Sequence, residues 1–130
     1  MRKIFYIVIL QFISLSMFSQ LTKLFTKHVN RVVESDFSGK QLTKEEITDD
    51  IFEFYFDKVN DTGYIKVTEN KTGKKWRMEL KEMYTGLAKG LKIYYFQSSD
   101  GKFKVSASKE EMGLAIASYA EKKMTVFYYK

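Results

Sequence analysis

Three stretches in which apolar and polar residues alternate follow one another between residues 51 and 82 of this chain. They cover residues 51–57, 63–69 and 75–82, and the links between them are rich in Asn, Asp, Thr and Gly. Side chains of a β-strand point alternately to opposite faces, so this pattern predicts strands with one buried face. The linking residues are typical of tight turns. Together these features predict an antiparallel meander and an all-β fold.

The predicted inner face of this meander is unusually aromatic. Aromatic residues make up 16% of the chain, and each buried ring removes a large apolar area from water. A small domain can therefore build a core from them. The residues predicted to point inward are Phe52, Phe54, Phe56, Ile65, Val67, Trp76, Met78 and Leu80.

Further strands are predicted on both sides of the meander. Residues 91–97, 102–107 and 124–129 show strand patterns, with Phe103, Val105 and Ala107 inward. Residues 112–119 contain alanines that would suit a helix, but the short connection to 124–129 favours a hairpin strand. Residues 21–33 have apolar residues at helical spacing and many β-branched residues. We expect a strand over about 24–33 there, with a helix as the alternative.

One short helical turn is expected before the meander. Thr43 is followed three residues later by Glu46, the arrangement of a helix capping box, so a turn is predicted around 44–49. The total is seven to eight antiparallel strands in a single up-and-down meander. A meander of that size usually closes into a barrel, because closure removes exposed strand edges. We therefore expect one barrel-like domain over residues 20–130.

The first nineteen residues have the pattern of a secretory signal peptide. Arg2 and Lys3 precede an apolar run that reaches Ile13, and small residues follow. Cleavage before Gln20 is expected, with cleavage after Ser16 as the alternative. The apolar run is shorter than a membrane-spanning helix requires. These features predict a protein exported by a Gram-negative bacterium, periplasmic or secreted, that is not an integral membrane protein after cleavage. The chain has no cysteine, which excludes disulfides, thiolate chemistry and a lipid-modified cysteine.

The chain lacks the residues that most kinds of active site require. The chain has one histidine, His28, and no nucleophile-elbow pattern, so we expect no catalytic residues and no enzyme activity. An acidic cluster at Glu45, Glu46, Asp49 and Asp50 offers oxygen ligands for Ca²⁺, but EF-hand spacing is absent and a charged helix start explains it better. We predict neither metal nor cofactor. The net charge is +6, and part of it comes from Arg2 and Lys3 in the signal segment. The remaining basic residues form no continuous stripe, so no nucleic-acid binding is expected.

A signal peptide followed by a meander of about eight short strands resembles the lipocalin, or calycin-like, barrels. The resemblance covers the strand pattern of residues 20–130, and it implies a binding role without identifying any functional residue. The single Trp76 follows Lys75, so the Gly-x-Trp motif of that family is absent.

Two functions follow as hypotheses. The first is binding of a small apolar ligand inside a barrel lined by Phe52, Phe54, Phe56, Trp76, Met78 and Leu80. The alternative is a protein- or envelope-interaction module that uses an outer aromatic face. The aromatic residues considered for that face are Tyr55, Tyr64, Tyr94, Tyr119, Phe127 and Tyr129. Such residues could also simply pair across strands and stabilise the sheet.

Overall fold

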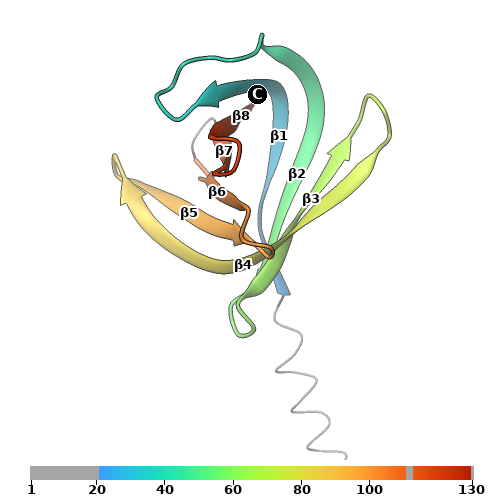
Figure 1. Ribbon diagram of the computed structural model, residues 1–130. Coiled ribbons are helices and arrows are strands. Elements are labelled where there is room, and N and C mark those ends of the chain that lie inside the picture. Colours follow the sequence, from blue (N-terminus) through green and yellow to red (C-terminus); the bar gives the residue numbers. More distant parts are fainter. Residues whose placement is uncertain (1–20, 111–112, 130) are drawn as a thin grey trace, which may run out of the picture.

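The computed structural model describes residues 21–110 and 113–129, all of which belong to one sheet and its connections. The predicted signal peptide, residues 1–19, lies outside the described residues. Figure 1 shows the strands winding around a common interior. The strands are β1 (Leu21–Asp36), β2 (Glu46–Asp57), β3 (Thr62–Glu69), β4 (Lys75–Ala88), β5 (Leu91–Ser98), β6 (Phe103–Ala107), β7 (Gly113–Ser118) and β8 (Lys123–Tyr129).

The sheet is a closed barrel in which every strand pairs antiparallel with its neighbours in the chain, and β1 also pairs with β8. This confirms the predicted all-β up-and-down meander. The strands are strongly staggered. Pairing partners followed from Leu21 through β2 to β8 lead back to β1 at Ser35, near its other end. A stagger of this size requires strands that are steeply tilted around the barrel axis.

The first strand differs from its prediction in length and in pattern. It spans Leu21–Asp36 rather than 24–33, and its pairing with β2 and β8 rules out the helical alternative. Its register shifts between Lys23 and Phe25 and again between Val29 and Arg31. In the pairing with β2, the first shift adds Leu24 to β1 and the second adds one residue to β2; in the pairing with β8, Asn30 is an extra residue of β1. Extra residues of this kind break the period of two. These two bulges produce the apolar spacing that imitates a helix.

The predicted helical turn at 44–49 is wrong. Strand β2 begins at Glu46, and its first residues pair with β1, Glu46 with Val32 and Ile47 with Arg31. The capping-box signal is local, and pairing with a long neighbouring strand outweighs it. The other ambiguous segment was interpreted correctly, because Gly113–Ser118 forms β7 and pairs with β6 and β8.

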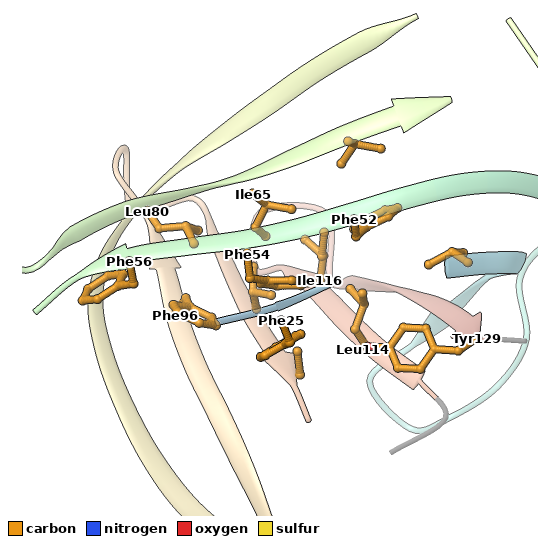
Figure 2. Close-up of a cluster of buried hydrophobic side chains, with 14 residues drawn as sticks. Phe25, Phe52, Phe54, Phe56, Ile65, Leu80, Phe96, Leu114, Ile116 and Tyr129 are labelled. Atoms are coloured by element: carbon orange, nitrogen blue, oxygen red, sulfur yellow. The ribbon is translucent and has the colours of Figure 1, made fainter. Parts of the chain in front are cut away.

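Aromatic side chains from several strands fill the middle of the barrel (Figure 2). The ring centre of Phe54 lies 4.5 Å from that of Phe25 and 6.0 Å from that of Phe96. Phe56 lies 5.9 Å from Phe96. Phe52 lies 4.9 Å from Phe127, further along the interior. Separations in this range are those of packed aromatic pairs, so the rings form a connected core.

Three connections are each held by an aspartate. The carboxylate of Asp36 accepts hydrogen bonds from the backbone and hydroxyl of Ser38 and from the backbone of Lys40. Asp57 accepts from Val59 and Asn60, and Asp100 from Ser98 and Lys102. These hydrogen bonds favour the ionised carboxylates and lower the pKa of all three below the ordinary value.

Candidate functional site

The six predicted lining residues all lie on the inner face of the barrel, but not in equal surroundings. Phe52, Phe54, Phe56 and Leu80 are at most 2% exposed. Trp76 and Met78 are partly buried and pack against this core from the edge. The indole nitrogen of Trp76 donates a hydrogen bond to the Glu69 carboxylate (3.0 Å), and its ring lies 6.2 Å from that of Phe52.

Two hollows lie beside these residues, at the edges of the packed core. One, of about 350 Å³, is lined by Phe56 together with Thr22, Leu24 and Lys58. Another, of about 400 Å³, is lined by residues that include Trp76, Met78, Ser98 and Phe103. Away from these hollows, the rings of Phe52, Phe54 and Phe56 contact other aromatic rings. These three side chains therefore mainly fill the core.

The candidate outer aromatic residues divide between the two faces. Tyr55 and Tyr64 stack on the outside with ring centres 4.8 Å apart, and Tyr119 is 54% exposed. The other three point inward. Tyr94 packs on Phe25, Phe127 packs on Phe52, and Tyr129 is only 7% exposed.

A second set of tyrosines borders a continuous hollow on the outside of β4 to β8, which we call the outer groove. It consists of two adjoining parts of about 330 and 200 Å³ that share Ser106 and Ala115. Its lining residues are Tyr84, Ile93, Tyr95, Phe96, Lys104, Val105, Ser106, Ala107, Ser108, Gly113, Leu114, Ala115, Ala117, Tyr119, Met124, Val126 and Tyr128.

The floor of the outer groove is formed by small residues on β6 and β7. Strand β7 alternates between buried residues and outward-facing Gly113, Ala115 and Ala117. Ala115 pairs with Ser106 of β6 and Val126 of β8, so three strands meet around it. Short side chains between taller neighbours leave a depression on an otherwise filled sheet surface.

Tyrosine rings form the walls. Tyr84 of β4 and Tyr95 of β5 are directly paired across the strands and stack with ring centres 5.6 Å apart. Tyr119 stands at the end of β7, where its ring meets Phe37 edge-on at 5.6 Å. Tyr84 is 57% exposed and Phe37 is 49% exposed, so these walls present aromatic surface to solvent. Rigid, amphipathic tyrosines of this kind are enriched in protein-binding surfaces.

Charges of both signs border the outer groove. Lys104 lines it, and its ammonium lies 5.3 Å from the centre of the Tyr119 ring. Arg31 lies over Tyr128 at 4.8 Å and also pairs with Glu45. In the other part of the groove, the hydroxyl of the lining residue Ser108 donates a hydrogen bond to the Glu110 carboxylate (3.1 Å). The positive charge of the lining is therefore local to Lys104.

Sequence reasoning missed this surface because of one bulge. Strand β4 was expected to end at 82, but it continues to Ala88 with an irregularity between Lys81 and Met83. Glu82 sits there at φ 55°, and the extra residue reverses the alternation. Tyr84 therefore points outward, although an unbroken count from Leu80 would place it inside.

The acidic cluster is divided between different surroundings, and one of its members, Asp49, lies beside His28. His28 Nε2 lies 2.5 Å from Asp49 Oδ1 on the outer face of the barrel, and Asp49 also accepts from Asn70. The strand sends Asp50 to the inner face, where burial and the charge of Glu69 raise its pKa. Glu45 pairs with Arg31. Within residues 21–110 and 113–129, no group of three or more histidine or acidic side chains could hold a metal ion.

Comparisons with models of protein families, with curated proteins and with solved structures found no match for this chain. The part of the chain described by the structure contains no helix of the length and apolarity that crossing a membrane requires.

Proposed function

We propose that this protein is an exported, non-catalytic binding module that holds an extended segment of another envelope protein in the outer groove. The observation that carries the proposal is the continuity of the groove, in which two hollows join over Ser106 and Ala115 between walls of tyrosine. A sheet surface covered by long polar side chains would have no groove of this kind.

The groove suits an extended chain better than a compact ligand. It crosses β5 to β8, and the small residues on its floor allow a backbone to approach closely. Pockets for alternate side chains are the usual source of specificity for extended peptides. Lys104 lies in the part lined by Tyr84 and Tyr119, so the expected segment places an acidic residue there among apolar or aromatic side chains.

A small apolar ligand inside the barrel is less well supported. The residues first considered for its lining, Phe52, Phe54 and Phe56, are already in contact with other rings and almost without exposed surface. The resemblance to lipocalins thus concerns the pattern of strands, and the proposed site lies on the opposite face of the sheet.

Site-specific photo-crosslinking in the native cells tests the proposal. A photoreactive amino acid replaces Ala117 in the groove or, as the matched control, Lys66 on the outer face of β3. We expect one discrete protein adduct at position 117, lost when Ala115→Trp fills the groove, and no such adduct at position 66. Equal labelling at both positions, or an adduct that survives Ala115→Trp, would contradict the proposal.

A further inference from the structure

The tips of β4 and β5 leave the barrel as a two-stranded hairpin, which we call the arm (residues 86–93). Strand β3 pairs with β4 only as far as Lys81, and β6 pairs with β5 only from Tyr94 onward. Residues 86–93 therefore make strand pairs only with each other. Figure 1 shows the arm reaching out to the left of the other strands.

The tip of the arm is a tight and well-defined turn. Lys89 and Gly90 both have positive φ, 51° and 79°, between the paired residues Ala88 and Leu91. Two consecutive residues with positive φ are characteristic of the type I′ turn, whose twist matches that of the strands. The arm thus presents its end side chains in a fixed orientation.

The arm combines apolar exposure with positive charge. Leu87 is 80% exposed, the most exposed of the large hydrophobic residues described. Lys92 is the cross-strand partner of Leu87 and lies 5.0 Å from the centre of the Tyr94 ring, and Lys89 occupies the turn. No acidic residue occurs between Glu82 and Asp100 in the sequence. The arm therefore presents an apolar side chain beside two lysines, with no acidic residue near them in the sequence.

The two hairpin turns that precede the arm in the chain lack this combination. The β2–β3 turn exposes Val59, but Asp57 and Asp61 flank it. The β3–β4 turn at 70–74 contains Lys71 and Lys74 but no apolar residue. Among these three turns, only the arm combines both features without an acidic residue beside them.

We propose that the arm is a docking element for the surface of an anionic lipid bilayer. Leu87 enters the boundary between headgroups and acyl chains, and Lys89 and Lys92 contact the lipid phosphates. The arm lies on the surface and does not cross the membrane.

Two weak attractions have to act together for this docking. A lysine close to an anionic bilayer strengthens binding about fivefold, and a single buried aliphatic side chain adds about tenfold or more. Neither suffices alone, since stable peripheral attachment generally requires both an apolar and a basic component. This predicts reversible binding that weakens as salt screens the lysines.

Sedimentation with vesicles separates the two attractions. The full mature chain is mixed with phosphatidylcholine vesicles, with or without about one third phosphatidylglycerol. We expect binding only to the anionic vesicles, reduced about thirtyfold in the double variant Lys89→Gln and Lys92→Gln. The matched double variant Lys71→Gln and Lys74→Gln removes the same charge from the neighbouring hairpin and should bind almost as well as the wild type. Equal loss in both pairs would show that net charge alone is responsible and would overturn the proposal.

Insertion of the arm is tested with a fluorescent label. The chain has no cysteine, so Leu87→Cys and, as control, Val59→Cys can each carry one environment-sensitive dye. Anionic vesicles should shift the emission of the dye at position 87 to the blue and leave that at position 59 unchanged. A blue shift without lipid that grows with protein concentration would instead identify a second copy as the occupant and contradict the proposal. Ala115→Trp should leave vesicle binding intact, so this inference and the outer-groove proposal can fail separately.

Discussion

Replacing Phe54 by alanine removes a ring from the middle of the barrel interior. The side chain has no exposed surface, and its ring contacts Phe25 at 4.5 Å and Phe96 at 6.0 Å. Phenylalanine-to-alanine substitutions in packed cores cost about 3–5 kcal/mol, from lost transfer free energy and the remaining cavity. Two aromatic pairs are lost as well, so we expect a decrease of about 4–5 kcal/mol in the free energy of unfolding.

The neighbouring residue supplies the control. Tyr55 faces outward and stacks on Tyr64 at 4.8 Å, so Tyr55→Ala should cost only about 1 kcal/mol. Both variants are measured by urea denaturation, followed by the fluorescence of Trp76 and by far-ultraviolet circular dichroism. Agreement between the two signals supports a two-state treatment.

The same variant creates a test for empty space. If Phe54 is part of a packed core, Phe54→Ala should also bind a small apolar probe such as xenon that the wild type excludes. A cost below about 1.5 kcal/mol, or xenon binding by the wild type at this position, would refute the packed interior. It would return the lining residues to the role of a ligand cavity.

Three further predictions follow from individual residues. Hydrogen bonds from the turn lower the pKa of Asp57 in the folded state. The contribution of Asp57 to stability is therefore complete above the unfolded pKa of about 3.9 and is lost as the pH falls through the folded pKa. In a plot of unfolding free energy against pH, Asp57→Asn should accordingly flatten the acid limb. The raised pKa of Asp50 has the opposite sign, so Asp50→Asn should raise the unfolding free energy at neutral pH, and this gain should disappear below the unfolded pKa in the same titration. Gly63→Ala should destabilise the protein by about 1–3 kcal/mol in urea denaturation, because a Cβ there would lie 2.1 Å from the carbonyl oxygen of Tyr55, whereas Gly86→Ala, whose nearest contact is 3.4 Å, should cost less.

The fold was predictable where strand alternation is unbroken. Residues 50–57 of β2 and the whole of β3 keep a strict period of two, and their inner residues Phe52, Phe54, Ile65 and Val67 are all fully buried. Side-chain period and burial are linked by backbone geometry, so the sequence alone determines the face of each residue there.

The site was not predictable because bulges reset that alternation. Leu24 is an extra residue of β1 relative to β2, Asn30 is one relative to β8, and Glu82 is the extra residue in β4. A bulge depends on the partner strand, which single-sequence reasoning does not supply. For the same reason the outward position of Tyr84 was missed.

The small residues of β7 carried no functional signal either. Gly113, Ala115 and Ala117 are consistent with a helix, a strand or a tight contact, and they become a groove floor only beside Tyr84 and Tyr95 of other strands. The residues of the groove come from strands that are distant in the sequence, and none of them forms a recognisable motif. Such a site leaves no local signal in the sequence.

Binding of the anionic dye 1-anilinonaphthalene-8-sulfonate tests most directly whether the apolar binding surface is the outer groove rather than the barrel interior. The dye combines an aromatic body with a negative charge, which matches the groove with its Lys104. We predict that the folded wild type binds the dye and that Ala115→Trp abolishes binding. Lys66→Gln, on the outer face of β3, should have no effect. Undiminished dye binding in Ala115→Trp at unchanged stability would contradict the account and direct attention back to the barrel interior.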